Sequence, residues 1–190
     1  MKFTFIIVLL ILFTQSCNSS VKKEDLSLTE THFTDVKKEA QYYFKGQNNK
    51  MDVFKNDVYF KPLVLANVSK NIGVHYIKVT TPKTFHDELY LNAAIFDSIE
   101  VYQYQNKKWV KQPQKSGILL PINKRPNDIY RTCIAPLKSS ISKNNTYILA
   151  LHSSNKFSAI IAPVSFKLGF QLFTYEGLSY FKTNKVFSSI

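Results

Sequence analysis

Apolar and polar residues alternate with a period of two along most of the chain from about Asp52 onward. Short runs rich in Val, Ile, Tyr and Phe recur between turn-forming clusters such as Asn71-Ile72-Gly73 and Asn106-Lys107-Lys108. Short strands at this spacing, with no long helical pattern between them, predict an all-β antiparallel sandwich. The expected strands cover 57–66, 74–80, 88–93, 98–105, 109–111, 129–135, 146–152 and 157–166.

A helical pattern precedes the first of these runs. Val36, Ala40, Tyr43 and Phe44 fall at i, i+4, i+7 and i+8, and Gly46 follows them. Because this spacing places the four side chains on one face of a helix, it predicts a short N-terminal helix over 34–44. The last residues, from about 176 onward, have no clear period and are expected to form a C-terminal tail.

The first seventeen residues form an export signal. Lys2 precedes an unbroken apolar run over 5–13, and the small residue Ser16 stands directly before Cys17. The run is too short for a membrane span, which needs about 20 apolar residues. A Cys after a small residue resembles the lipobox of bacterial lipoproteins, in which the thiol carries lipid. Ordinary cleavage near Ser16, with an incidental Cys17, is the alternative.

These patterns divide the chain into four parts: a lipoprotein signal peptide over 1–16, a tether and short helix over 17–50, a sandwich over 51–175 and a tail over 176–190. The expected location is the cell envelope, with the chain anchored to a membrane through lipid on Cys17 and facing either the periplasm or the cell surface. After the signal, the apolar runs are far shorter than a membrane span needs.

The chain is basic, with a formal charge of +12 and a pI near 9.6. Nearly all of the cations are Lys, and Arg125 and Arg131 are the only arginines. Arg is the residue that most often binds phosphates and bases, and it is rare in this chain. Because the chain also carries an export signal, nucleic acid is not an expected partner. Anionic headgroups or acidic polysaccharide suit an exported chain better, and a general Lys-rich composition explains the same count without any partner.

No catalytic or metal-binding motif is evident. Cys133 is the only cysteine besides Cys17 and lies in a strand-like run, which favours a buried, inert thiol. His86-Asp87-Glu88 is interpreted as a polar turn, because adjacent residues of an extended chain point to alternate faces. His75 and His152 are expected as strand residues rather than bases. Nucleophile-elbow, zinc-protease and phosphate-loop motifs are absent, so the sequence predicts no enzyme, no metal and no cofactor.

Trp109 is the only Trp and stands in the basic stretch Lys107-Lys108-Trp109-Val110-Lys111. One interpretation has it exposed, stacked on a sugar ring or placed at a membrane interface; the other has Asn106-Lys107-Lys108 as a hairpin turn and Trp109 as a core anchor.

Tyrosines suited to a carbohydrate platform are Tyr102, Tyr104, Tyr130, Tyr147 and Tyr175. If a ligand binds, we expect Arg125 or Arg131 to act together with Trp109 or Tyr130, since sugar rings stack on aromatic planes and Arg supplies five donors. Pairing of Arg131 with Asp97, Glu100 or Asp128 is the structural alternative.

The order of segments from Val74 onward resembles the extracellular sensor domain of bacterial seven-transmembrane receptors with diverse intracellular signalling modules. The resemblance rests on His75-Tyr76-Ile77-Lys78-Val79, Glu88-Leu89-Tyr90-Leu91, Phe96-Asp97-Ser98-Ile99-Glu100-Val101-Tyr102, Arg125-Pro126 with Arg131, Ala135-Pro136-Leu137 and the paired runs 146–154 and 159–164. It covers roughly residues 67–177. Tyr76 and Lys78 stand where the family usually has Trp and Arg.

The resemblance implies a jelly-roll-like sandwich, related to carbohydrate-binding modules, that senses an extracellular ligand such as a sugar. The family continues into seven membrane helices where this chain ends, so a truncated signalling receptor is one expectation. The expected function is that of an exported, lipid-anchored, non-catalytic ligand-binding module. A structural or protein-interaction lipoprotein of the cell envelope, without a small-molecule ligand, is the alternative.

Overall fold

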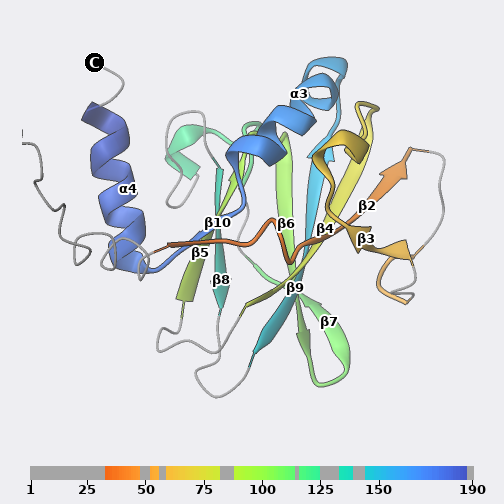
Figure 1. Ribbon diagram of the computed structural model, residues 1–190, viewed down its shortest axis with the longest axis horizontal. Helices are drawn as coiled ribbons and strands as arrows, with labels where there is room; N and C mark the ends of the chain where they lie inside the picture. The colour runs from red at the N-terminus through yellow and green to blue at the C-terminus, as the bar shows by residue number, and fades with distance from the viewer. Residues whose placement is uncertain are drawn as a thin grey trace, which may run out of the picture. The chain divides into compact units, whose positions relative to one another are not determined.

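The computed structural model describes residues 33–47, 52–55, 59–81, 88–113, 116–124, 133–138 and 144–187. These residues form two antiparallel sheets, one with the strand order β3-β2-β4-β9-β6-β7 and one with the order β1-β10-β5-β8 (Figure 1). The strands are β1 Phe33–Asp35, β2 Gln41–Gly46, β3 Lys61–Pro62, β4 Gly73–Thr81, β5 Glu88–Ala94, β6 Ser98–Gln105, β7 Lys108–Lys111, β8 Cys133–Lys138, β9 Asn145–Ser153 and β10 Gln171–Phe173. The predicted antiparallel, sandwich-like arrangement is therefore confirmed, but the prediction of an all-β fold is wrong, because two C-terminal helices accompany the sheets.

The main hydrophobic core lies between the two sheets. Alternate residues of the central strands face inward, as the period of two requires. The larger sheet contributes Ile77, Val79, Ile99, Val101, Tyr147, Leu149 and Leu151, and the smaller sheet contributes Leu89, Leu91, Cys133, Ala135, Leu137 and Leu172. All of these are at least nine-tenths buried. We call this side of the six-stranded sheet its inner face and the opposite side its outer face.

Several strands agree closely with the sequence pattern. The predicted run 98–105 coincides with β6, and the runs 74–80 and 146–152 differ from β4 and β9 by one residue at each end. The run 57–66 is largely wrong, because its described part holds only the two-residue β3 and the 3₁₀ turn Leu65–Asn67. The last part of the run 129–135 is confirmed by β8, while residues 129–132 lie outside the described residues.

A tight turn joins β6 to β7, as the sequence predicted. Gln105 pairs with Lys108, and the two residues between them, Asn106 and Lys107, have φ values of 49° and 63°. Positive φ at both central positions is the geometry of a type I′ hairpin turn, whose twist matches that of the flanking strands. The turn therefore brings β7, with Trp109, beside β6.

The predicted N-terminal helix over 34–44 is wrong. Its residues form β1, a turn and β2, and β2 pairs with β4 in the register Tyr42↔Ile77 and Phe44↔His75. Tyr42 and Phe44 contact the inner core, whereas Tyr43 contacts the outer-face cluster. Aromatic residues in an alternating pattern fit a pleated strand well, and pairing with β4 outweighs the four positions that matched a helical period.

The run 157–166, predicted as a strand, is instead the helix α3, Lys156–Leu168. Asn155 caps its N-terminus: the Asn155 side chain accepts a hydrogen bond from the Ser158 N–H, and the Ser158 hydroxyl accepts one from the Asn155 N–H. The buried Asp97 carboxylate accepts further hydrogen bonds from Ser154, Asn155 and Ser158. Burial raises the pKa of Asp97, but these hydrogen bonds outweigh it and hold the pKa below 3.8.

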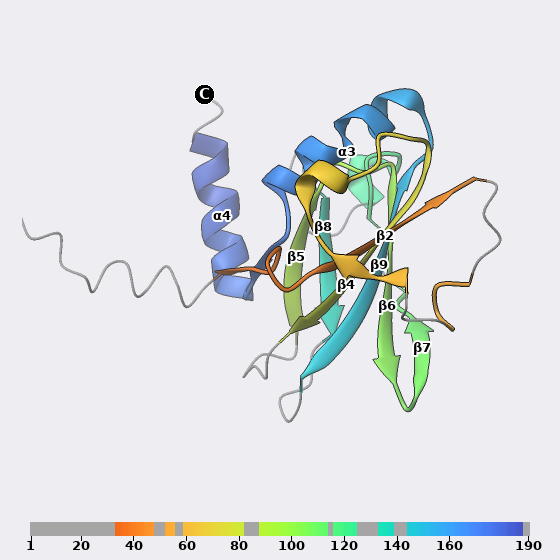
Figure 2. The same ribbon diagram turned by 45° about the vertical axis from the view of Figure 1, so that its right-hand side comes forward.

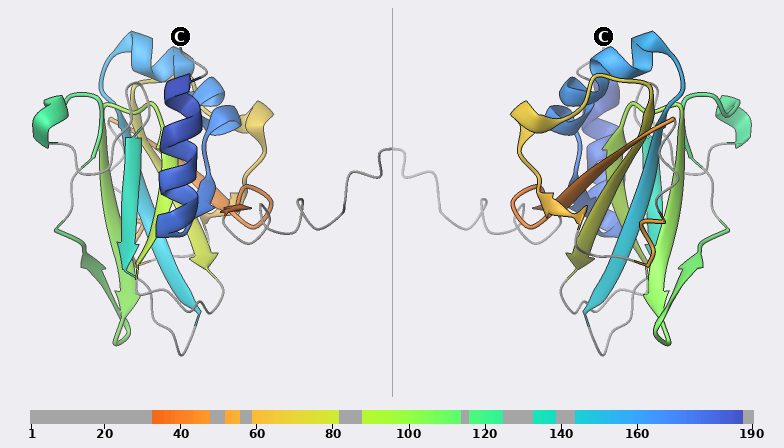
Figure 3. Two further views of the ribbon diagram at one scale, coloured as in Figure 1. Left: turned by 90° about the vertical axis from the view of Figure 1, so that its left-hand side faces the viewer. Right: turned by 90° about the vertical axis from the view of Figure 1, so that its right-hand side faces the viewer.

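The second helix, α4, covers Tyr175–Phe187, where no periodic pattern was expected. Leu178 and Phe181 pack against Tyr90, Ile134 and Phe173 on the outer side of the four-stranded sheet. Figure 3 shows α4 running alongside this sheet. The outer side of the four-stranded sheet is therefore covered by a helix.

Candidate functional site: an aromatic groove on the outer face of the larger sheet

The outer face of the six-stranded sheet carries aromatic and polar side chains in cross-strand rows. One row follows the pairs Tyr43↔Tyr76, Tyr76↔Ala150 and Ala150↔Glu100. The next row runs Lys78↔Ile148, Ile148↔Tyr102 and Tyr102↔Lys111. Because alternate residues of a strand share a face, these side chains lie opposite the inner core.

Residues 52–55 cover part of this face. Val53 is buried against it, and the Phe54 ring lies 4.5 Å from the Tyr102 ring, 6.2 Å from the Tyr76 ring and 6.4 Å from the Trp109 ring, between centroids. The Asp52 carboxylate accepts a hydrogen bond from the Phe54 N–H at 3.1 Å, which closes the local turn. Phe54 therefore forms one wall of the open surface beside it.

An open groove of about 540 Å³ lies between Phe54 and the β6–β7 hairpin. Its aromatic side consists of Phe54, Tyr104 and Trp109, and its polar side consists of Lys55, Lys78, Thr80 and Thr146. Thr80 and Thr146 lie on adjacent strands, with their hydroxyl oxygens 3.2 Å apart. Aromatic planes beside hydroxyls and ammonium groups form a surface suited to a polar ligand that has apolar faces.

Trp109 is half-buried and lies neither in the inner core nor free in solvent. Its ring is 5.1 Å from the Tyr104 ring, and the Tyr104 side chain is itself exposed. The interpretation of Asn106-Lys107-Lys108 as a hairpin turn is correct. The accompanying interpretation of Trp109 as an anchor in the core between the sheets is wrong. The indole lies beside the Phe54 and Tyr104 rings and lines the groove with them.

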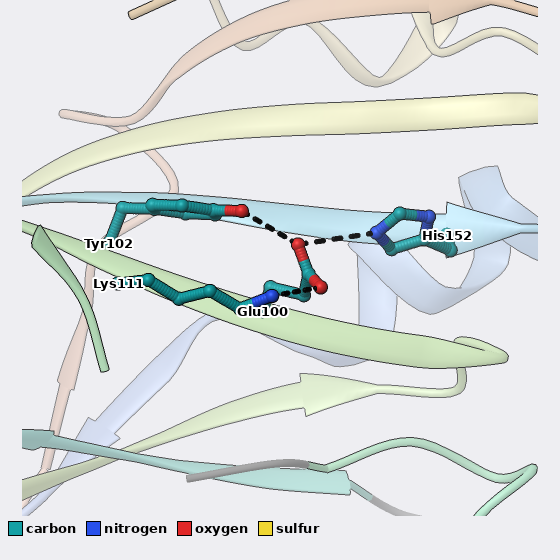
Figure 4. Close-up of polar contacts among 4 residues, drawn as sticks. All are labelled: Glu100, Tyr102, Lys111 and His152. Atoms are coloured by element: carbon teal, nitrogen blue, oxygen red, sulfur yellow. Dashed lines mark hydrogen bonds and ion pairs between the residues drawn. The ribbon is translucent and has the colours of Figure 1, made fainter. Parts of the chain in front are cut away.

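Glu100 lies at the centre of a polar cluster on the same face (Figure 4). Its carboxylate accepts hydrogen bonds from Lys111 Nζ at 2.5 Å and from the Tyr102 hydroxyl at 2.8 Å, and His152 Nε2 lies 3.9 Å from its second oxygen. Partial burial raises the pKa of Glu100, but Lys111 and Tyr102 outweigh this and lower the pKa below 4.5. Glu100 is therefore a carboxylate at neutral pH, held in place by its neighbours.

The same neighbours act on the other members of this cluster. Burial lowers the pKa of His152 below 6.5, and Glu100 opposes that effect. Burial and the hydrogen bond to Glu100 both raise the pKa of the Tyr102 phenol. At neutral pH the cluster therefore contains a carboxylate, a neutral imidazole and a neutral phenol beside the Lys111 side chain.

A second hollow, of about 280 Å³, lies at the other end of these strands, beside Tyr76, His152 and Ser154. Its wall includes Gly73, where a Cβ atom would approach the Lys45 carbonyl oxygen to 2.4 Å. Glycine is therefore required for the close approach of β2 to β4 at this point. This hollow lacks Trp109 and the two threonines, so the larger groove is the stronger candidate site.

Only part of the predicted site lies in the described residues. Trp109 lines the groove, whereas Arg125, Tyr130, Arg131 and the lipidation residue Cys17 lie outside the described residues. Of the predicted platform tyrosines, Tyr104 lines the groove and Tyr102 lies on the same face, but Tyr147 is buried in the inner core and Tyr175 lies on α4.

The groove also contains residues that the sequence did not single out: Phe54, Lys55, Lys78, Thr80 and Thr146. The alternation in β4 places Lys78 and Thr80 together on one face, and that in β9 places Thr146 away from the core. The alternation within each strand could be read from the sequence. The sequence did not show that β4 pairs with β9, which brings these residues together.

His75 and Cys133 are buried in the inner core, on β4 and β8. Burial lowers the pKa of His75 to about 4, so the ring is neutral; its Nδ1 and the Tyr42 hydroxyl share a hydrogen bond of 3.1 Å. Within the described ranges, no cluster of three His, Cys, Asp or Glu residues is arranged to hold a metal ion. Among the same residues, no helix is long and apolar enough to cross a bilayer.

Comparison with protein-family models gives no match for this chain, and a search of curated proteins finds no significant sequence relative. The function is therefore inferred from the groove itself.

Proposed function

We propose that the domain is a non-catalytic carbohydrate-binding module, exported and held at the cell envelope by lipid on Cys17. The observation that carries the proposal is the groove on the outer face, in which Trp109, Tyr104 and Phe54 lie beside the side chains of Thr80, Thr146 and Lys78. Loops and sheet faces of a sandwich can both carry such sites, because side chains converge there without disturbing the core.

The chemistry of the groove fits a sugar chain. The apolar faces of pyranose rings stack on aromatic side chains, which bury large areas and present flat surfaces. Hydroxyl groups on the sugar edge can exchange hydrogen bonds with Thr80 and Thr146, since a hydroxyl is both donor and acceptor. The open form of the groove suits an extended sugar chain better than a small enclosed ligand.

The charge of the groove favours an acidic sugar. Among the described lining residues, the charged ones are Lys78 and Lys55, and Lys55 also lies 3.7 Å from the Asp52 carboxylate. Together with the formal charge of +12, this favours polysaccharides that carry carboxylates, such as chains of uronic acids. Lys78 also lies 6.0 Å from the centroid of the Phe60 ring, a contact that helps to orient its ammonium group.

Calorimetric titration with an oligogalacturonate and with a neutral oligosaccharide of equal length tests the proposal. We expect saturable binding of the acidic chain, a loss of at least about tenfold in affinity for Trp109→Ala, and a smaller loss for Lys78→Gln. Tyr180→Ala is the matched control, because Tyr180 is an exposed aromatic residue on α4.

A glycan array extends this test to other sugars. Binding that is unchanged in Trp109→Ala would remove the groove from the proposal. If a folded domain binds no glycan on the array, the alternative of a structural or protein-interaction lipoprotein is favoured.

A further inference from the structure

The helix α3 has an unusual distribution of polarity. A surface helix normally buries its apolar stripe and exposes polar residues. The buried residues of α3 are Ser158, Ala159, Ala162, Ser165 and Phe166, two of which are serines. The residues on its solvent side are instead apolar, and Phe157, Ile160, Val164 and Leu168 are 54–68% exposed. The solvent side of α3 is thus more apolar than packing on the sandwich requires.

These four exposed residues form a continuous row, which we call the apolar row. Spacings of three, four and four residues place them on one side of the helix. The row is about 16 Å long at 1.5 Å per residue. The 3₁₀ turn η2, Leu65–Asn67, packs beside α3, and Val64 and Leu65 at this turn are also exposed. Contiguous exposed apolar surface of this kind marks an interaction site.

Positive charge lies at both ends of the apolar row. Lys156 is the first residue of α3 and Lys167 lies in its last turn, and both are exposed. No Asp or Glu occurs between them. Lys37 adds a further ammonium group near the C-terminal end, where its Nζ donates a hydrogen bond to the Lys167 carbonyl at 3.1 Å. Lys156 opposes the helix macrodipole at the N-terminus, so its position does not serve helix stability.

We propose that α3 docks the domain onto an anionic lipid bilayer, with the apolar row inserted at the headgroup boundary and the lysines on the headgroups. A helix with apolar residues on its exposed side and lysines at the margin has the composition of helices that lie in the interface plane. Lysine side chains can reach headgroup phosphates while their stems stay against apolar surface.

The proposed anchor on Cys17 makes such docking effective even when it is weak. Fifteen residues, Asn18 to His32, separate the anchor from β1. Fully extended, they span at most about 50 Å. The tether therefore keeps α3 close to the bilayer, which raises its effective concentration there to about the millimolar range. This step rests on the proposed function; the bilayer affinity of α3 itself does not.

Docking through α3 also leaves the groove accessible. The views in Figures 1 and 2 place α3 at one end of the sandwich and the β6–β7 turn at the opposite end. Tyr104 and Trp109 lie next to that turn and line the groove. A bilayer against α3 would therefore face away from the hairpin, and the groove would stay open to an extracellular polymer.

Vesicle co-sedimentation tests the proposal. The mature chain with Cys17→Ser, which lacks only the acyl anchor, is mixed with vesicles of phosphatidylcholine and phosphatidylglycerol, and with vesicles of phosphatidylcholine alone. We expect binding to the anionic vesicles that weakens as salt is added. Ile160→Gln with Val164→Gln should reduce it by about tenfold or more, because two apolar side chains no longer leave water. Gln is a good helix former, so these exposed positions should tolerate it.

Two matched variants sharpen the result. Leu119→Gln removes an equally exposed apolar residue outside α3 and should bind vesicles like the parent chain. Lys156→Gln with Lys167→Gln should remove most of the preference for anionic lipid. No vesicle binding, or equal binding by the Ile160/Val164 variant, overturns the proposal. Self-association that this variant abolishes, without vesicle binding, also overturns it and assigns the apolar row to a second copy of the chain. No sugar is present, so failure here does not test the groove.

Discussion

The two faces of the six-stranded sheet are built from the same strands, but one packs against the second sheet and the other carries polar and aromatic side chains beside a smaller apolar cluster. On β9, Tyr147, Leu149 and Leu151 face the second sheet and are completely buried. The alternating residues Thr146, Ile148, Ala150 and His152 face outward, where the neighbouring strands place Lys78, Tyr102 and Glu100. One residue of shift along the strand therefore separates the hydrophobic core from the candidate binding surface.

This difference separates stability from binding. The inner face is sealed by the smaller sheet and by Ala162 and Phe166 of α3, so substitutions there act on the whole fold. Among the described residues, the outer face has a partial cover around Val53, Phe54 and Phe60. The polar side chains of the outer face contribute less to stability, so substitutions there can alter ligand binding without unfolding the domain.

The largest effect is expected from the inner face. Leu149→Ala removes a completely buried side chain from the main core and should reduce the free energy of unfolding by about 2–5 kcal/mol, because it leaves a cavity. Thr146→Ala, on the same strand but facing outward, should cost less than about 1 kcal/mol. Urea denaturation of both variants measures the contrast, and equal losses would contradict the assignment of the two faces.

The second effect is a pH dependence that arises from His75 on the inner face. Its pKa is about 4 in the folded state and about 6.5 in the unfolded state, so the unfolded state binds the proton first. The stabilisation is present above pH 6.5 and is lost as the pH falls towards 4, by about 3 kcal/mol in all.

Denaturation at several pH values measures this loss, and His75→Phe is the matched variant. Phe is chosen because the imidazole lies among the rings of Phe44, Phe96 and Phe166. Its unfolding free energy should fall less steeply between pH 6.5 and 4.5, although loss of the Tyr42 hydrogen bond lowers it at every pH. Parallel pH profiles would show that His75 is not the source.

The smallest effect is expected on the outer face. Glu100→Gln should change the unfolding free energy by less than about 1 kcal/mol, because the carboxylate and Lys111 are both partly exposed. It should lower the pKa of His152 further, since Glu100 raises that pKa. Lys111→Gln should act in the opposite direction, because Lys111 lowers the same pKa. NMR titration of the imidazole nitrogens distinguishes the two shifts, and shifts of the same sign would contradict the arrangement in Figure 4.

The sequence predicted strands best where alternation reflects burial on a single face. The strand β6 alternates buried Ile99, Val101 and Gln103 with less buried neighbours, and its ends were predicted correctly. The segment that became α3 failed for a physical reason. It is apolar on nearly every side, and a short apolar run does not distinguish a buried strand from a helix. The pair Asn155 and Ser158 was the available signal, because a cap residue followed by a hydrogen-bonding partner three positions later marks a helix start.

The candidate site was only partly predictable. Trp109 could be singled out from the sequence because it is unique and lies next to a turn. Phe54 and Thr146 could not, because their place in the groove depends on the fold of residues 52–55 over the sheet and on the pairing of β4 with β9. Such contacts join residues far apart in the chain, and alternation within one strand holds no information about its neighbours.

The burial of Cys133 has a consequence for measuring motion in the smaller sheet. A chain without Cys17 has Cys133 as its single thiol, and that side chain is completely buried where β8 pairs with β5. A thiol reagent can reach it only after β8 separates from its surroundings, so the ratio of its labelling rate to that of an exposed thiol gives the equilibrium constant for opening when reclosing is fast. Labelling as slow as global unfolding would show that β8 separates only when the whole domain unfolds. Faster labelling would show that the smaller sheet opens locally while the larger sheet stays folded.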